Sequence, residues 1–256
     1  MALITEPVRF NPDMINSQVV GIAASVGRHD SGMHSHQKAQ LLYAPSGSMN
    51  ITLDNHQCIL PPTRAAWIPA GINHCAVMTN IVAYRSIYFD TRQKDNFPDQ
   101  IRILGVNPLL RELIERMAFW PWQMPFNEQE AVVNLFWQEL ASSPDETLLL
   151  PLPSDPRLAA WLDKLKHPGY TPAPLNEAAL SIGASEKTIS RIFTRETGMP
   201  YQAWRQQWRL MKAIELLSGN NTVSTVAFEL GFSSDSAFIS FFRKQTGSTP
   251  SQYIRT

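Results

Sequence analysis

Three histidines and one glutamine have types and spacing that could support chemistry. His34 and His36 are separated by one residue, Gln40 follows four positions later, and His74 lies in the segment WIPAGINHC. Residues at i and i+2 of a strand point to the same side, so the pair predicts two imidazoles on one strand directed to one place. Three imidazoles with a neutral amide can hold a divalent metal such as Zn²⁺, Ni²⁺ or Cu²⁺. The same groups can instead bind a small ligand in a pocket or serve only internal packing, and all three interpretations stay open.

A second set of side chains, rich in hydrogen-bond donors, lies in the C-terminal hundred residues. In the segment EKTISRIFTRET, Ile189, Ile192 and Phe193 have helical spacing and are expected to be core. The opposite face carries donors suited to base edges near the helix start and to phosphates further along, namely Lys187, Ser190, Arg191, Thr194 and Arg195. In the segment around DSAFISFFRKQT, the accessible side chains that are expected to contact DNA are Ser234, Asp235, Ser236, Ser240, Arg243 and Lys244.

These two segments belong to a diverged internal repeat. At an offset of 48 the first copy matches the second at three pairs, Ala179 with Ala227, Gly183 with Gly231 and Ser185 with Ser233. At an offset of 49 it matches at four more, Phe193 with Phe242, Arg195 with Lys244, Thr197 with Thr246 and Gly198 with Gly247. Each copy predicts a short helix, a turn at Gly, a Ser cap and a second helix ending at Gly, which is the layout of a helix-turn-helix. Two hairpins of an ordinary helical bundle are the alternative, and the repetition argues against it.

The C-terminal segment is similar to a known family. Arg209-Leu210, Ala213, Leu217 and the stretch VAFELGFSSDSAFISFFRKQTGSTPSQY resemble the signature of AraC/XylS-type transcription regulators over about residues 155–256. The resemblance implies a seven-helix domain whose two recognition helices contact successive major grooves of double-stranded DNA. Ile239-Ser240 departs from the usual Ser-Arg of the family, which Ser190-Arg191 keeps. We therefore expect the first recognition helix to read more of the base sequence than the second.

The histidines are predicted to lie in a β-rich domain. From Val19 to Asp90, short apolar runs such as VVGIAASV, MNITL and VAYRSIYF alternate with turn residues, which is typical of an antiparallel sandwich or barrel. Two amphipathic helices are predicted next, the first with an apolar face of Leu109, Leu110, Leu113, Ile114 and Met117. The histidine pair, Gln40 and the later histidine resemble the motifs of cupin barrels, which some AraC/XylS relatives carry as sensor domains. Gln40 stands where cupins usually have a Glu.

The predicted fold class is α+β with two domains. Residues 1–142 are expected to form a cupin-like barrel with a helical tail, and residues 157–256 an all-α DNA-binding domain with two helix-turn-helix units. The proline-rich residues 143–156 are predicted to be the linker. The net charge of zero hides an asymmetry, because residues 1–152 hold 10 Lys and Arg against 14 Asp and Glu, whereas residues 153–256 hold 12 against 8. The basic half is where a polyanion partner is expected.

Cysteine content and the N-terminus predict the compartment. The two cysteines, Cys58 and Cys75, form no CxxC pair, so neither a disulfide framework nor a thiolate zinc site is indicated. The N-terminus lacks the basic start and apolar run of a signal peptide, and no stretch has the apolar length of a membrane span. We expect a cytoplasmic protein with no membrane partner.

Together these features predict a one-component transcription factor. The N-terminal domain would sense a small-molecule effector or a divalent metal, and no other cofactor is assigned. The C-terminal domain would bind a promoter or operator as an activator, a repressor or both, acting on RNA polymerase if it activates. The family resemblance also implies a homodimer through the helix at Asn127–Ala141, for which packing on its own barrel is the alternative, and control of a neighbouring transporter or catabolic operon.

Two other function classes compete with this prediction. A metal-dependent cupin enzyme with a helical appendage would need an open metal site with a general base, and the missing Glu and the tandem helix-turn-helix argue against it. An architectural DNA-binding protein without sensing usually relies on stronger basicity than this chain has.

Overall fold

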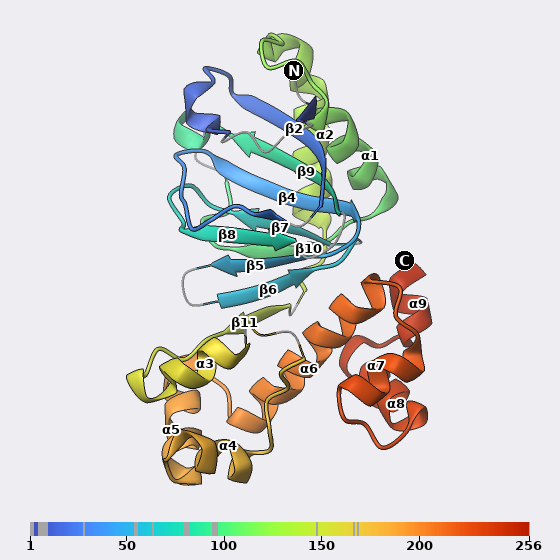
Figure 1. The fold of residues 1–256 in the computed structure, drawn as a ribbon. Helices are drawn as coiled ribbons and strands as arrows, with labels where there is room; N and C mark the ends of the chain where they lie inside the picture. Colours follow the sequence, from blue (N-terminus) through green and yellow to red (C-terminus); the bar gives the residue numbers. More distant parts are fainter. Residues whose placement is uncertain are drawn as a thin grey trace. The chain divides into compact units, whose positions relative to one another are not determined.

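The computed structural model of the 256-residue chain describes all residues except 1, 2, 5–9, 28, 54, 55, 63, 79–81, 94–96, 147, 166, 168 and 256. Two compact units are present: Met1–Asp54 with Ile59–Leu148, and Asn55–Cys58 with Leu149–Thr256. The first, which we call the β-rich unit, consists of strands and two α-helices, and the second, the helical unit, is mainly α-helical (Figure 1). The predicted α+β class is therefore confirmed. Among the described residues, no helix combines the length and the apolar character needed to span a membrane.

Two sheets form the β-rich unit. The larger has the strand order β1-β2-β9-β4-β7-β10, and the smaller contains the order β6-β5-β8-β3. The cupin resemblance predicts a closed barrel, whereas the described strands form two separate sheets. The strands are β1 (Leu3–Ile4), β2 (Val19–Val26), β3 (His29–Asp30), β4 (Ala39–Ser46), β5 (Met49–Leu53), β6 (His56–Leu60), β7 (Arg64–Ile68), β8 (His74–Met78), β9 (Val82–Phe89) and β10 (Arg102–Gly105).

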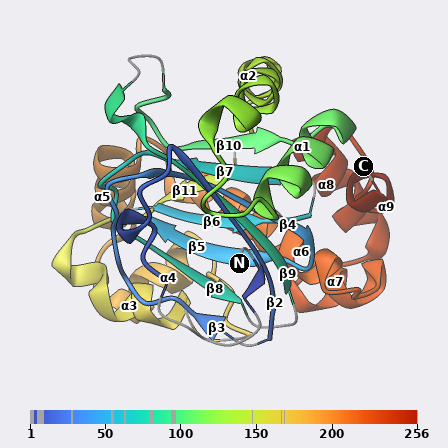
Figure 2. The ribbon, with the colours of Figure 1, turned by 90° about the horizontal axis from the view of Figure 1, so that it is seen from above.

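Helices α1 (Pro108–Ala118) and α2 (Phe126–Ser142) pack on one face of the larger sheet (Figure 2). Side chains alternate along a strand, so Leu41 of β4 contributes to the core beneath these helices while its neighbour Gln40 points to the other face. Strand β2 approaches α1 closely at Gly21, where a Cβ would lie 2.0 Å from the Met117 carbonyl oxygen. The pattern of period two thus separates an apolar face from a partly polar one.

The predicted apolar face of α1 needs one correction. Leu110, Leu113, Ile114 and Met117 are buried, but Leu109 is 46% exposed. At about 100° per residue, Leu109 lies roughly 90° from the centre of the buried stripe, at its edge. Four of the five predicted residues therefore form the core contact.

The helical unit is built around the long helix α6 (Tyr201–Ser218), which packs against α5 on one side and against α7 and α9 on the other. Helices α4 and α5 form the first copy of the repeat, and α7 and α8 form the second. The remaining elements are β11 (Leu149–Pro151), α3 (Ala159–Leu165), α4 (Leu175–Ile182), α5 (Glu186–Thr197), α7 (Val223–Glu229), α8 (Asp235–Thr246) and α9 (Pro250–Arg255), with short 3-10 turns at Pro12–Met14, Thr91–Gln93 and Pro156–Leu158.

Part of the predicted linker 143–156 belongs to the helical unit. Strand β11 lies within it and pairs with His56–Cys58 of β6. The Trp204 indole of α6 donates a hydrogen bond to the Pro151 carbonyl oxygen at 2.7 Å. The chain from Leu149 onward is therefore attached to the helices that follow it.

Candidate functional site

The two copies of the repeat have the same frame. Each first helix is followed by a glycine in the left-handed region, with φ of 75° at Gly183 and 68° at Gly231. In the first copy Ser185 caps α5 by accepting a hydrogen bond from the Thr188 amide at 3.2 Å. The tight turn and the cap are the features that the sequence predicts for a helix-turn-helix.

The cap of the second copy is Ser234, whereas the repeat alignment at an offset of 48 predicts Ser233. Ser234 accepts from the Ala237 amide at 3.2 Å, so one extra residue separates Gly231 from the cap. From the cap onward the two helices correspond at an offset of 49. Both have 12 residues, since α5 spans Glu186–Thr197 and α8 spans Asp235–Thr246.

The ends of α5 and α8 are also alike. Thr197 donates a hydrogen bond to the Phe193 carbonyl at 2.7 Å, and Thr246 donates to the Phe242 carbonyl at 2.9 Å. Both phenylalanines are fully buried. The next residue in each copy is a glycine with φ between 70° and 80°. The frame that holds the exposed face is therefore built in the same way twice.

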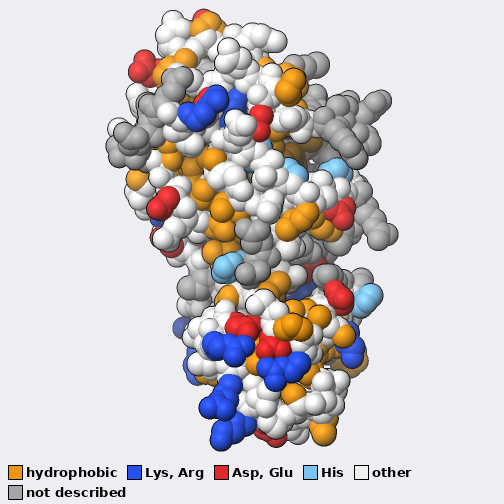
Figure 3. Space-filling view, turned by 90° about the vertical axis from the view of Figure 1, so that its left-hand side faces the viewer, with side chains coloured by type: hydrophobic (Ala, Val, Ile, Leu, Met, Phe, Trp, Pro, Cys, Tyr) orange, Lys and Arg blue, Asp and Glu red, His pale blue; other side chains and the backbone are white. Residues whose placement is uncertain are grey.

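The exposed face of α5 is basic. Lys187, Arg191 and Arg195 are four residues apart, so they lie on one side of the helix, and all three are exposed. In the described part of the chain, neither Lys187 nor Arg191 has an ion-pair partner. Arg191, Arg195, Ser190 and Thr194 line an open groove with Arg157. Figure 3 shows Lys and Arg side chains gathered on the helical unit.

The exposed face of α8 has a different character. At the offset of 49, Ser236 and Ser240 stand where α5 has Lys187 and Arg191, and Lys244 stands where it has Arg195. All of the predicted contact residues of α8 are exposed, namely Ser234, Asp235, Ser236, Ser240, Arg243 and Lys244. The Asp235 carboxylate accepts a hydrogen bond from the Ser224 hydroxyl, so this acidic group is already engaged within the second copy.

Acidic groups that the sequence does not single out hold the last turn of α5. Arg195 lies 2.5 Å from Glu196 and 3.5 Å from Asp155, measured from Nη2 to the carboxylate oxygens. Arg157 binds Asp155 through two hydrogen bonds of 2.7 and 2.8 Å, and this guanidinium holds the pKa of the Asp155 carboxyl well below its usual range. The short spacing of Asp155 and Arg157 and the adjacency of Arg195 and Glu196 are visible in the sequence, whereas the contact between Arg195 and Asp155 is not.

Glu196 also holds the chain that enters the helical unit. Its Oε2 accepts hydrogen bonds from the backbone amides of Ser154 and Asp155 at 2.8 and 3.0 Å. Residues 154 and 155 are therefore fixed to the end of α5.

Arg209 of α6 supports the second copy. Its guanidinium is buried, donates to the Leu230 carbonyl at 2.7 Å and lies 3.8 Å above the centre of the Phe232 ring. Burial lowers the pKa of Arg209 to about 10. The residue thus fixes the turn between α7 and α8 to the long helix.

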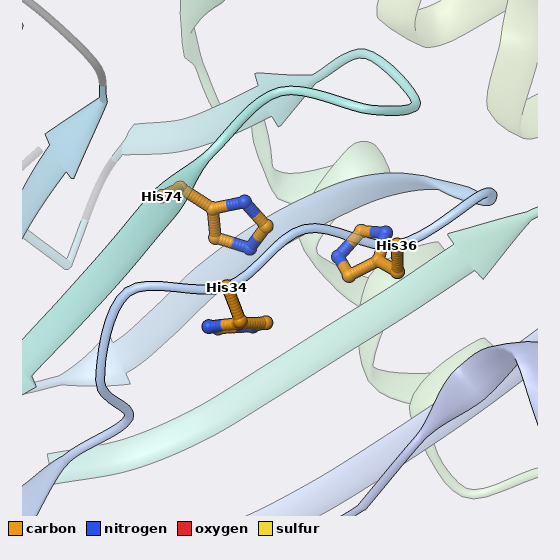
Figure 4. Close-up of side chains that lie close together, drawn as sticks. All are labelled: His34, His36 and His74. Carbon is orange, nitrogen blue, oxygen red and sulfur yellow. The ribbon is translucent and has the colours of Figure 1, made fainter.

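In the β-rich unit, His34, His36 and His74 lie together (Figure 4). The prediction that His34 and His36 lie on one strand is wrong, because residues 31–38 have no regular strand and His34 forms only an isolated bridge. That bridge joins it to His74, the first residue of β8, through backbone hydrogen bonds of 3.0 and 2.9 Å. The pairing brings the ring centroids of His34 and His74 to 4.4 Å, and those of His36 and His74 to 4.9 Å.

The hydrogen bonds of the three rings follow one pattern. Nδ1 of His34 contacts the Gly32 carbonyl at 2.9 Å, Nδ1 of His74 contacts the Ile72 carbonyl at 2.9 Å, and Nδ1 of His36 contacts the Lys38 carbonyl. A carbonyl can only accept, so each Nδ1 carries the proton and each Nε2 holds the lone pair in the neutral ring. Burial lowers the pKa of His36 and brings that of His74 to about 4, so both rings are neutral near pH 7.

Gln40 completes the predicted set. Its amide nitrogen donates to Ser86 at 2.7 Å and to Tyr88 at 3.0 Å, and its Oε1 lies 3.2 Å from His36 Nε2. Cys75, the neighbour of His74, is turned elsewhere, since its thiol donates to Asp30 at 3.1 Å. All four predicted residues, His34, His36, Gln40 and His74, are thus brought together.

Comparison with known proteins gives two family matches. Residues 16–168 match an AraC-like ligand binding domain, and residues 178–256 match a helix-turn-helix domain. The transcriptional regulator NimR of Escherichia coli (strain K12) is 29% identical over 248 residues, which cover 96% of this chain and 90% of NimR. VirF of Yersinia enterocolitica, a virulence regulon transcriptional activator, is 25% identical over 207 residues, which cover 75% of this chain and 72% of VirF.

Among solved structures, ToxT from Vibrio cholerae strain SCE256, with an unsaturated fatty acid bound, aligns with 93% of this chain and 95% of its own. The sequence identity is 9% and the TM-score is 0.36, so this alignment adds nothing to the family matches. NimR and VirF are regulators of transcription, and neither comparison supports the enzyme alternative. The chain therefore belongs to the AraC family of transcriptional regulators, in which an AraC-like ligand-binding domain precedes a DNA-binding helix-turn-helix domain.

Proposed function

We propose that α5 and α8 are the recognition helices of this regulator, and that α5 supplies most of the base recognition at an operator. The observation that carries the proposal is that α5 and α8 have the same caps and the same length but carry different exposed side chains. Lys187 and Arg191 are exposed on α5 where α8 has Ser236 and Ser240. An arginine can form a bidentate contact with guanine that a serine cannot form.

The division of labour follows the position of each side chain along its helix. In α5, Lys187, Ser190 and Arg191 lie in the first half and would contact base edges, whereas Thr194 and Arg195 would contact phosphates. In α8, the shorter side chains of Ser234, Ser236 and Ser240 would reach less far toward the bases. Arg243 and Lys244 would contact the phosphates of the DNA backbone. Asp235 would act on α8 itself, because its carboxylate lies in the first turn, where it complements the helix dipole.

The long helix α6 sets the separation of the two copies. Its 18 residues correspond to a length of about 27 Å. Successive major grooves on one face of a duplex are about 34 Å apart. A rigid connector of this length suits two recognition helices that enter adjacent segments of groove.

The proposed effector site is the cluster of His34, His36, Gln40 and His74 in the β-rich unit. It offers hydrogen-bonding and ligating groups, and His34 is exposed, so a small molecule or ion can reach it. An effector would change transcription by binding unequally to the forms of the protein that do and do not bind the operator. Activation through RNA polymerase and repression both fit tandem recognition helices, because the sign depends on where the operator lies relative to the promoter.

A homodimer through α2 and a cytoplasmic location stay predictions. The apolar residues Val133, Phe136 and Leu140 of α2 are buried in the core of their own unit. An interface with another molecule of this chain would have to use the outer face, where Leu135 is 38% exposed. The location follows from operator DNA as the proposed partner.

Footprinting of the purified chain on genomic DNA, with and without small-molecule extracts, tests the proposal. We expect protection of two adjacent major-groove segments on one face of the duplex, and the neighbouring operons are the first place to look. A protein that protects no genomic fragment even at low salt would contradict the proposal.

A further inference from the structure

We infer that His34, His36 and His74, with Gln40 beside them, form a binding site for one divalent transition-metal ion. The inference rests on the proposed function only where it identifies this cluster as the effector site. One ligand atom from each histidine lies within 4.8 Å of those of the other two. Three side chains from different segments can therefore direct their nitrogens to one ion.

The first support is the common orientation of the rings. Each Nδ1–H is held by a backbone carbonyl, of Gly32, Lys38 or Ile72. Histidines that ligate metals nearly always donate the other ring nitrogen in this way, which fixes the tautomer and leaves Nε2 as the ligand. Here all three rings donate Nδ1–H to a backbone carbonyl, although packing alone would not require the same orientation in each.

The second support is a buried polar atom without a partner. His74 is 1% exposed, and its Nε2 forms no hydrogen bond with the described residues. Buried polar atoms in folded proteins almost always have a partner, so an isolated one indicates a missing water or ion. A metal ion would satisfy this lone pair.

The third support is the position of the Gln40 amide beside the histidines. Its Oε1 lies 3.2 Å from His36 Nε2 and so offers an oxygen ligand next to the imidazole nitrogens. The amide nitrogen of Gln40 is turned away and donates to Ser86 and Tyr88. A cation next to both atoms stabilises this geometry, and one ion can serve His34 and His74 as well.

The donor set also indicates the class of metal. Three imidazole nitrogens and an amide oxygen suit Zn²⁺, Ni²⁺ or Cu²⁺ better than Mg²⁺ or Ca²⁺, which prefer oxygen ligands. These ligands are neutral, so the bound ion keeps its charge. Because His34 is exposed while His36 and His74 are buried, the site is accessible from the His34 side, where water or an anionic small molecule can complete the coordination.

Metal titration of the full-length chain tests this inference. Protein without an affinity tag is treated with a chelator and titrated with Co²⁺, whose visible absorption reports its ligands, and Zn²⁺ affinity is measured by competition. We expect one ion per chain. His34→Ala and His74→Ala should each weaken binding at least tenfold, while the matched control His56→Ala, outside the cluster, should leave it unchanged.

Substitutions of Gln40 should either raise or lower the affinity of the site for the ion. Gln40→Glu adds a charged ligand that Ser86 and Tyr88 can still hydrogen-bond, so ion affinity should rise about tenfold or more. Gln40→Leu removes the oxygen and should lower it. Circular dichroism identifies variants that fail to fold, and the exposed His34 keeps the test decisive if His74→Ala is one of them.

Absence of stoichiometric binding would overturn the inference, and so would equal losses in His34→Ala and His56→Ala. Operator binding is measured separately by footprinting. A chain that binds the ion but no operator would overturn the proposed function and leave this site standing. A chain that binds an operator but no ion would overturn the metal site and leave the proposed function standing.

Discussion

The two copies of the helix-turn-helix share a frame and differ in the surface that it carries. Ser185 and Ser234 cap helices of equal length, and Thr197 and Thr246 close them with the same hydrogen bond. On the exposed side, Lys187 and Arg191 of α5 are replaced by serines in α8. Caps, glycines and buried phenylalanines thus specify the fold, and we propose that two or three exposed positions specify the interaction with DNA.

The largest effect is expected from removing Arg209, which supports the second copy. Arg209→Ala deletes the hydrogen bond to Leu230 and the contact with Phe232, so the second copy should lose about 2–4 kcal/mol of stability. Hydrogen exchange should show loss of protection in α8 and little change in α5. The exposed Arg243→Ala is the control, and equal loss of protection in both helices would show that the copies are not supported separately.

The next largest effect concerns the exposed faces. Arg191→Ala should weaken binding to the operator by about 1–3 kcal/mol and binding to random DNA by less, because a bidentate base contact is lost. Ser240→Ala at the equivalent position should cost about 0.5–1 kcal/mol. Binding isotherms on both DNAs measure the difference. If Arg191→Ala weakens both equally, Arg191 contacts only phosphate.

The two capping serines should contribute equally to the stability of their helices. Ser185→Ala and Ser234→Ala should each lower the free energy of unfolding by about 1 kcal/mol, because each removes the acceptor for an amide of the first turn. Ser233→Ala is the matched control and should change it little, since the structure assigns the cap to Ser234. Urea denaturation measures the free energy of unfolding of all three variants. A large decrease in Ser233→Ala would show that Ser233 is the cap, as the repeat alignment at an offset of 48 predicts.

The smallest effect is expected from making α8 resemble α5. Ser240→Arg should raise affinity for random DNA by less than about 1 kcal/mol at physiological salt. The slope of log affinity against log salt should steepen by about 0.9, the value for one added phosphate contact. Ser240→Gln, which is polar but neutral, should leave the slope unchanged. An unchanged slope in Ser240→Arg would mean that this side of α8 does not approach the duplex.

Much of the helical unit could be predicted from the sequence, because its signals are local. A capping serine and a glycine beyond the last turn act on residues three or four positions away. The misplaced cap is instructive, since Ser233 and Ser234 have the same chemistry and only the turn geometry decides between them. The contact of Arg195 with Asp155 is not predictable from the sequence, because the two residues are 40 positions apart and nothing local indicates it.

The histidine cluster was predicted for a reason that proved partly wrong. The spacing of His34 and His36 suggests a strand, yet the segment is irregular, and the convergence comes from the bridge between His34 and His74. Long-range pairing of this kind leaves no periodic trace in the sequence. Likewise, the proline content of residues 143–156 does not reveal that Pro151 is bound by Trp204.

The hydrogen bonds of Glu196 fix the chain that enters the helical unit to α5. Ser154 and Asp155 are held at the last turn of this helix, next to the cation Arg195. Just upstream, the Pro151 carbonyl is bound by Trp204 of α6. A displacement of the entering chain therefore acts directly on α6 and α5, whereas among the described residues α8 is reached only through α6 and its neighbours, so the two helices that we propose to contact DNA would not respond alike.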